Sequence, residues 1–280
     1  MASNKNPKCM CPSCNQIGTH KLPVRKRGGG NGFLCDYHWR NADPYSADNM
    51  LWIGAPKAHG FTASMEFETS YTSKKARIEL TANGFRPTED ATVDVEYKSP
   101  CYNGFNALAA ILPSLQDLTD AGDMQVGPTC GTHLHIGNRE HINRTTMSAI
   151  IRFYHSLFVP VCRALEADPD KMEAIFGRCL GGWADRISTT TEPENHRNFI
   201  NVQHPTTIEF RLCKFKSAEQ YARAVKLCRE LSEIIVDTFV GKYESLGSPS
   251  RYDTTPEQKA ALKKAAEKAA KKMVRAFENA

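Results

Sequence analysis

Apolar and polar residues alternate in several short stretches of the chain. Residues 61–69 read FTASMEFET, in which every second residue from Phe61 to Phe67 is apolar. This period of two is typical of a strand with one buried face. Similar runs lie at residues 76–83, 92–98, 129–137 and 206–212. The pattern therefore predicts a sheet of short strands.

Helical periodicity fills much of the remaining sequence. Apolar residues recur every three or four positions in residues 105–115, where Pro113 is expected to kink the helix. The same spacing runs through residues 147–165, where Pro160 is expected to interrupt it. Between residues 176 and 201 the periodicity fades, which indicates an irregular connection or a loop over a site.

Two further helices are expected towards the end of the chain. Ser217 followed by Gln220 has the spacing of a capping box, and Gly241 is expected to end the helix that begins there. Thr255 and Gln258 begin an alanine- and lysine-rich helix with a narrow apolar stripe. We expect this last helix to pack weakly, on the body or on a partner.

Together these elements predict a four-part organisation. Residues 60–245 are expected to form the main α+β domain, and residues 246–280 the carboxy-terminal helix. Residues 1–45 form a separate cysteine- and histidine-containing module, which residues 46–59 link to the main domain.

Ionisable residues occur two positions apart in four of the predicted strands. The pairs are Glu66 and Glu68, Asp94 and Glu96, His133 and His135, and Glu209 and Arg211. Residues two apart in a strand share a face, and a charge that points inward needs a metal, a partner or a substrate to offset its desolvation. The four strands are therefore expected to line one cavity, although a histidine pair alone also suits simple packing.

The composition is that of an ordinary globular protein, with 41% hydrophobic residues, and this excludes disordered and fibrous classes. The net charge of +5 is concentrated at the ends, because residues 1–50 carry seven basic against three acidic residues and residues 251–280 carry eight against four. Contact with nucleic acid or another polyanion is one interpretation, and two solvated ends is the other.

Cysteine and histidine cluster near the amino terminus. The expected ligands of a structural Zn²⁺ ion are Cys11, Cys14, Cys35 and His38. Two closely spaced ligand pairs separated by a longer bridge are typical of a closed tetrahedral zinc site. Cys9 and His20 are additional candidates, and free thiols are the alternative. The basic, glycine-rich bridge over residues 25–32 is expected to form a hairpin tip, with phosphate binding as the other interpretation.

Several function classes lack their sequence signature. The chain has no apolar run of about 18 residues and no secretory pattern, so we expect no membrane contact and a cytoplasmic location. No P-loop and no GxSxG motif occurs. Cys130 beside the histidine pair suggests a thiol nucleophile, but a small buried filler is the simpler interpretation.

Four motifs in order, FTASMEFET, VDVEYKSP, CGTHLHIG and TTIEFRL, resemble the amidoligase family of carboxylate–amine ligases, which has the glutamine synthetase fold. The family pattern falls on residues 61–68, 90–100, 130–135 and 201–211. The resemblance covers about residues 60–240. It implies an antiparallel or mixed sheet shaped as a bowl, with helices on one face.

The resemblance also implies the chemistry and the site residues. ATP and Mg²⁺ would activate a carboxylate as an acyl phosphate, which an amine or a peptide then attacks. The residues that it assigns to one magnesium ion are Glu66, His133 and Glu209, and to another Glu68 and Glu96. Arg211 would contact phosphoryl oxygens, Asn201 would bind nucleotide with it, and His135 would be a further catalytic residue.

The sequence is also compatible with two other functions. The same metal cluster also suits a phosphodiesterase, with the zinc module and the basic ends docking nucleic acid. A non-catalytic binding protein with a degenerate site is the third reading. Retention of so many buried charges argues against the third, because unused charges would be costly to bury.

Overall fold

The computed structural model describes residues 20–25, 31–34, 52–53, 61–88, 93–103, 105–138, 141–142, 144–181, 184–193, 195–204, 207–245 and 254–280. The four expected zinc ligands, Cys11, Cys14, Cys35 and His38, lie outside the described residues. Most of the expected linker at residues 46–59 lies outside them too.

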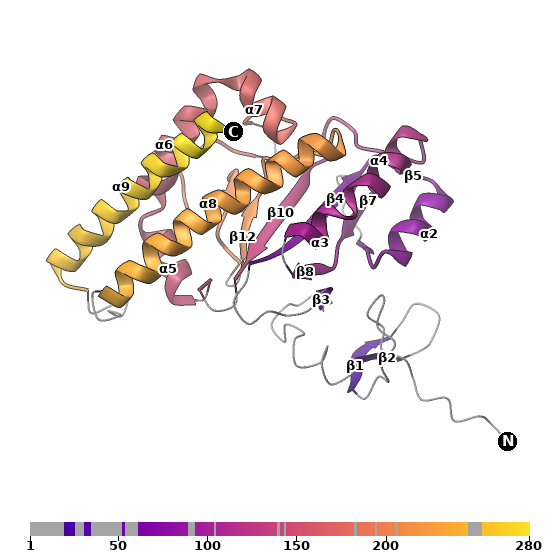
Figure 1. The fold of residues 1–280 in the computed structure, drawn as a ribbon, viewed down its shortest axis with the longest axis horizontal. Coiled ribbons are helices and arrows are strands. Elements are labelled where there is room, and N and C mark those ends of the chain that lie inside the picture. The colour runs from indigo at the N-terminus through magenta and orange to yellow at the C-terminus, as the bar shows by residue number, and fades with distance from the viewer. Residues whose placement is uncertain are drawn as a thin grey trace.

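The centre of the fold is an antiparallel sheet in which strands distant in sequence lie side by side (Figure 1). Its strand order is β11 (Ile200–Asn201), β12 (Thr207–Phe210), β10 (Thr132–Gly137), β4 (Thr62–Thr69), β7 (Val95–Lys98) and β6 (Arg86–Thr88). β8 (Cys101–Asn103) also pairs with β4, and β3 (Trp52–Ile53) joins β8 in parallel. The predicted α+β class and the predicted antiparallel or mixed sheet are therefore confirmed.

The other described strands form two small sheets. β1 (His20–Arg25) and β2 (Asn31–Leu34) pair antiparallel on either side of the basic, glycine-rich bridge, which agrees with the expected hairpin. β5 (Tyr71–Thr72) pairs with β9 (Met124–Gln125) beside the central sheet.

One face of the central sheet is apolar and forms the core. On β4 the side chains of Met65 and Phe67 are fully buried, and Leu134 on β10 lies opposite Met65. The ring of Phe67 packs on Phe215 with their centroids 5.5 Å apart. The hydroxyl of Tyr221, on the helix that crosses this face, donates a hydrogen bond to the Thr132 carbonyl at 3.3 Å. The alternation read in the sequence thus separates a core face from a polar face.

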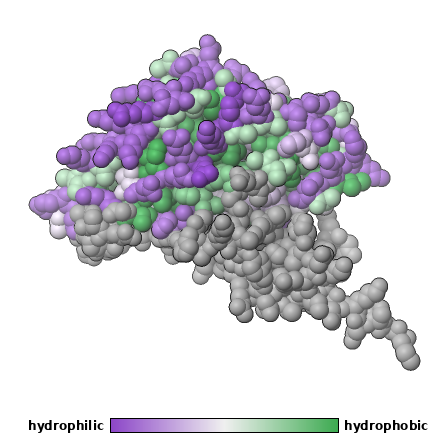
Figure 2. All heavy atoms as spheres, in the orientation of Figure 1, coloured by the Kyte–Doolittle hydropathy of each residue, from purple (hydrophilic) through white to green (hydrophobic). Residues whose placement is uncertain are grey.

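Helices pack against the apolar face of the sheet and against one another. They are α2 (Lys74–Ala82), α3 (Phe105–Ala109), α4 (Leu112–Asp120), α5 (Arg144–Arg152), α6 (Tyr154–Ala167), α7 (Pro169–Phe176), α8 (Ala218–Ser245) and α9 (Pro256–Asn279). The long α8 runs across β10 and β12, and α9 lies beside α8 and α6 (Figure 1). Hydrophilic residues cover most of the outer surface of these helices (Figure 2).

The strand expected at residues 76–83 is wrong, because this segment is helix α2. Ser73 caps the helix, since its hydroxyl accepts a hydrogen bond from the Ala76 amide at 3.1 Å. Ala76 and Leu80 are buried one turn apart, whereas Ile78 is 62% exposed. The apolar Ile78 gives this segment the alternation of a strand although its side chain is exposed. The cap at Ser73 favours a helix instead.

Proline and glycine act differently from the expectation at three positions. Pro113 lies in the first turn of α4, where a missing amide costs little, so the segment is two helices and not one kinked helix. Pro160 lies inside α6 and does not end the helix. The helical segment over residues 147–165 is divided instead at Phe153, whose backbone is not helical. α8 continues through Gly241 because buried residues such as Phe239 hold the helix in place by packing.

The expectation of weak packing for the carboxy-terminal helix is also wrong. α9 lies against both α6 and α8, and its side chains Leu262, Met273 and Phe277 are buried. The helix begins at a capping box, because Thr255 and Gln258 exchange hydrogen bonds of 3.2 and 2.8 Å. Within the described part of the chain, no helix is both long enough and apolar enough to cross a membrane.

Candidate functional site

The polar face of the central sheet gathers the ionisable residues that the sequence singled out. The residues on this face are Glu66 and Glu68 of β4, Glu96 and Lys98 of β7, His133 and His135 of β10, Glu209 of β12 and Asn201 of β11. Pairing in register brings them together, since His133 lies opposite Glu66, Glu68 opposite Glu96, and Glu209 opposite both His135 and Asn201. Five strands therefore contribute to one cluster.

Glu66, His133 and Glu209 form the centre of the cluster. One ligand atom from each lies within 4.8 Å of the others. The Nδ1 atom of His133 is 3.4 Å from an oxygen of Glu66 and 3.4 Å from an oxygen of Glu209. Two buried carboxylates this close repel each other unless a cation lies between them. The donor set fits a divalent cation, with oxygen ligands suited to Mg²⁺ and one imidazole.

Glu68 and Glu96 form a second carboxylate pair beside this centre. Glu68 accepts a hydrogen bond from the Gly131 amide, and Glu96 accepts one of 2.9 Å from the Thr88 hydroxyl. Gly131 is required here, because a Cβ atom at this position would lie 2.7 Å from His133 Nε2. Burial raises the pKa of Glu96, and the nearby charge of Glu66 raises it further. A second cation beside Glu96 would stabilise the charged form of this carboxylate.

The residues of the cluster shift each other's proton affinity. Burial opposes charge on Glu66, but the neighbouring His135 and His133 outweigh it and hold the pKa of Glu66 well below its usual range. Burial likewise disfavours charge on His135, yet the Glu66 carboxylate raises the pKa of this imidazole. The pKa of Glu209 falls to about 2 despite burial, chiefly through His204 and then His135 and His133. The neighbouring imidazoles therefore favour the charged forms of Glu66 and Glu209.

Hydrogen bonds fix Glu209 at one end of the cluster. The Asn201 amide donates to one of its oxygens at 2.6 Å, and the Arg211 guanidinium donates to the other at 2.7 Å. Glu209 is 1% exposed, so Glu209 and Arg211 are not a pair of solvated surface charges. Asp94 does not join the cluster, because it is a partly exposed partner of Arg77 at 3.7 Å.

The sequence reasoning missed four basic side chains near the carboxylates. Lys98 Nζ lies 3.2 Å from Glu66 and 3.6 Å from Glu96, and its position two residues after Glu96 on the same strand could have revealed it. His204 Nε2 lies 3.4 Å from Glu209. His204 lies in a bend after β11, where the sequence has no periodicity from which the direction of its side chain could be predicted.

Arg178 and Lys214 are the other two missed basic side chains. Arg178 donates a 3.1 Å hydrogen bond to the Cys130 carbonyl, and its Nη1 atom is buried without a hydrogen bond among the described residues. Burial lowers the pKa of Arg178, against the pull of the Glu68 carboxylate. Lys214 donates to the Gly127 carbonyl at 2.7 Å. Both come from irregular segments, so their approach to the site depends on the tertiary fold.

Cys130 does not suit the role of nucleophile. The residue is buried, and burial raises the pKa of its thiol. A thiol of high pKa holds little of the reactive thiolate near neutral pH. Cys130 therefore fits the interpretation of a small buried filler.

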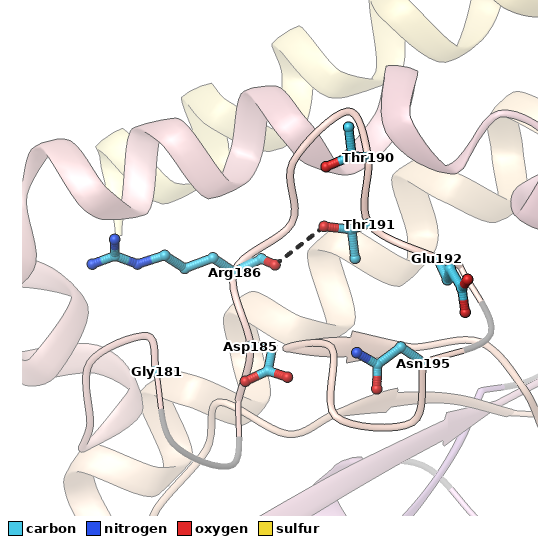
Figure 3. Close-up of a pocket in the computed structure, with 7 residues that line it drawn as sticks. All are labelled: Gly181, Asp185, Arg186, Thr190, Thr191, Glu192 and Asn195. Atoms are coloured by element: carbon cyan, nitrogen blue, oxygen red, sulfur yellow. Dashed lines mark hydrogen bonds between the residues drawn. The ribbon is translucent and has the colours of Figure 1, made fainter.

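An open polar hollow lies apart from the cluster, in the loop between α7 and β11 (Figure 3). It has a volume of about 530 Å³ and is lined by Gly181, Asp185, Arg186, Thr190, Thr191, Glu192 and Asn195. Thr191 donates a long hydrogen bond of 3.5 Å to the Arg186 carbonyl within it. None of the lining residues belongs to the cluster on the sheet.

Comparison with protein families gives a match to residues 60–178, for the family described as "Putative amidoligase enzyme". This match confirms the resemblance read from the motifs, and it indicates ligase activity in general. The matched residues include β4, β7 and β10, whereas β11 and β12 lie beyond them. No curated protein matches the chain.

Proposed function

From the match of residues 60–178 to the amidoligase family, we propose that this protein is an ATP-dependent carboxylate–amine ligase. Its substrates are a carboxylate and an amine or peptide, which it joins through an amide bond. The proposal includes a sheet shaped as the bowl of the glutamine synthetase fold, and the four-part organisation with a zinc module at residues 1–45. The observation that carries it is the cluster of four carboxylates and two imidazoles on one sheet face.

The carboxylates of the cluster suit bound Mg²⁺. Glu66, His133 and Glu209 would hold one ion, and Glu68 with Glu96 another. Bound Mg²⁺ would offset the negative charge of the ATP phosphates while a phosphoryl group moves. Lys98 lies 3.2 Å from Glu66, and Arg211 and Asn201 donate hydrogen bonds to Glu209, but four carboxylates gathered on one face still favour a bound cation.

The cations at the edge of the cluster suit the phosphoryl group. Arg211 offers a planar fork to phosphoryl oxygens, and Asn201 holds the neighbouring Glu209 in position for it. Arg178 has a buried nitrogen aimed at no acceptor among the described residues, and Lys214 adds charge nearby. An anion placed here would meet several positive charges in a largely buried setting.

The proposed reaction has two steps. An oxygen of the substrate carboxylate attacks the terminal phosphorus of ATP, and ADP leaves. The amine nitrogen then attacks the carbonyl carbon of the acyl phosphate, and inorganic phosphate leaves with the bonding electrons. The amine must lose a proton, and His135 is the imidazole placed within the cluster to take part in that transfer.

Trapping the activated carboxylate tests this function. Purified protein is incubated with ATP, Mg²⁺, a mixture of carboxylates and hydroxylamine, and both ADP and hydroxamate are measured. We expect the two products in equal amounts, with both reduced in Glu209→Gln when Mg²⁺ is limiting. Asp94→Asn is the matched control, because this acid lies outside the cluster, and it should behave as the wild type.

The same assay separates the alternatives. ADP released without a carboxylate substrate would contradict ligase chemistry. Metal-dependent cleavage of a phosphodiester substrate with no use of ATP would favour the hydrolase interpretation instead. Failure of every substrate combination, together with metal binding, would favour a binding protein.

A further inference from the structure

We propose that His135, His204 and Glu209 form a second kind of metal site, which selects a first-row transition-metal ion over Mg²⁺. The proposal goes beyond the ligase function. It shares Glu209 with the magnesium site proposed above, and it uses His135, which takes part in the proposed proton transfer only when this second ion is absent. One ligand atom from each of the three residues lies within 4.8 Å of the others. The His135 and His204 rings meet edge to face with their centroids 5.2 Å apart.

The two oxygens of Glu209 face two different groups of donors. Its Oε1 atom lies 3.4 Å from Nδ1 of His133, on the side of Glu66. Its Oε2 atom lies 3.4 Å from Nε2 of His204. Asn201 also donates to Oε2, but a carboxylate oxygen has lone pairs for both a hydrogen bond and a cation. Glu209 is therefore placed to bridge two ions.

His135 supplies a second and independent indication of a ligand. The residue is 5% exposed, and its Nε2 atom makes no hydrogen bond among the described residues, although Glu66 Oε1 lies 3.5 Å away. A buried ring nitrogen without a hydrogen bond is costly to maintain. Coordination of a cation would satisfy the imidazole.

The donor set decides which metal is bound. Two imidazoles and one carboxylate suit Mn²⁺, Co²⁺, Ni²⁺ or Zn²⁺, whereas Mg²⁺ prefers oxygen ligands and retains its water. The His204 side chain is 49% exposed, so the site opens to solvent on that side. Three protein ligands with an open side leave room for a water molecule or a substrate atom.

Titration with Co²⁺ in the absence of ATP tests the site. The full-length protein is stripped of metal, placed in excess Mg²⁺ and titrated with Co²⁺, while visible absorption and binding heat are followed. We expect one Co²⁺ to bind with the spectrum of nitrogen and oxygen ligands and to resist displacement by Mg²⁺. In His204→Ala this binding should weaken by more than about tenfold.

Two variants control the experiment. His196→Ala removes another exposed histidine outside the group and should bind Co²⁺ as the wild type does. Glu66→Gln leaves the three donors in place, so it should lower Mg²⁺ binding and keep the Mg²⁺-resistant Co²⁺ site. Absorption from cysteine-bound cobalt reports the amino-terminal module and should be equal in all variants.

Two results would overturn the proposal. One is Mg²⁺-resistant Co²⁺ binding in His204→Ala equal to that of the wild type. The other is full displacement of Co²⁺ from this spectrum by Mg²⁺ in the wild type. Because no ATP is present, a failed ligase assay with intact Co²⁺ binding would contradict the proposed function alone.

Discussion

Arg211 and Glu209 share one carboxylate–guanidinium contact of 2.7 Å, yet we assign them opposite electrostatic roles. Lysine at position 211 keeps the positive charge but loses the planar fork that contacts two oxygens at once. We expect Arg211→Lys to lower ATP turnover by roughly ten- to a thousandfold with the fold intact. ATP consumption and amide formation across a Mg²⁺ titration provide the measurement.

Glu209→Gln is the companion variant in that titration. An amide is a poorer ligand for a hard cation, so the Mg²⁺ requirement should rise before the maximal rate falls. Circular dichroism checks that both variants are folded. Wild-type turnover in Arg211→Lys, with an unchanged Mg²⁺ requirement in Glu209→Gln, would remove both residues from the catalytic site.

Metal binding should release protons from the cluster. The neighbouring Glu66 raises the pKa of His135 against the effect of burial, so without a metal this imidazole keeps its proton to a higher pH than an ordinary histidine does. A protonated imidazole and a divalent cation compete for the same carboxylates. The apparent metal affinity should therefore increase as the pH rises through the raised pKa, and level off above it.

Calorimetry in buffers of different ionisation enthalpy measures these protons directly. The observed binding heat should depend on the buffer near pH 7, and the dependence should shrink in His135→Asn. Binding heat that is independent of the buffer in the wild type would contradict the assignment of a proton to His135.

At the scale of elements, α9 belongs to the body of the protein and is more than a solvated appendage. Phe277 is 2% exposed between α9, α6 and α8, and Lys171 lies over its ring at 5.7 Å. We expect Phe277→Ala to lower the free energy of unfolding by about 3–5 kcal/mol, because it leaves a cavity in a packed core. Urea denaturation measures the change.

Lys271→Ala is the matched control on the same helix, since Lys271 is exposed and should change stability by less than about 0.5 kcal/mol. Deletion of residues 255–280 should expose the apolar faces of α6 and α8 and cause unfolding or aggregation. A truncated protein as stable as the full chain would show that the packing of α9 contributes little.

The sheet and most of the site could be predicted from the sequence, because both depend on the alternation of side chains between the two faces of a strand. Alternation along β4, β10 and β12 assigned Glu66, His133 and Glu209 to one face, and strand pairing brought them together. The same rule failed at residues 76–83, where a single exposed apolar side chain imitated a strand. Arg178 and Lys214 could not be predicted, because irregular backbone has no period from which to read a direction.

At the scale of the whole molecule, the amino-terminal module remains a prediction. Cys11, Cys14, Cys35 and His38 should bind one Zn²⁺ per chain, since a segment this small needs a metal to fold. Elemental analysis of purified protein should find that zinc and its loss in Cys35→Ala. An unchanged zinc content in this variant would reject the ligand set.

The strand order has a consequence for folding during synthesis on the ribosome. β10 has β4 on one side and β12 on the other, but β12 is synthesised about seventy residues after β10. While those residues are being added, the nascent sheet exposes an open edge and a face that already carries Glu66 and His133 without Glu209. The nascent chain therefore has no complete cluster, and an unpaired edge of this kind invites pairing with another chain. The proposed site of Glu66, His133 and Glu209 is therefore complete only after residue 209 has been synthesised.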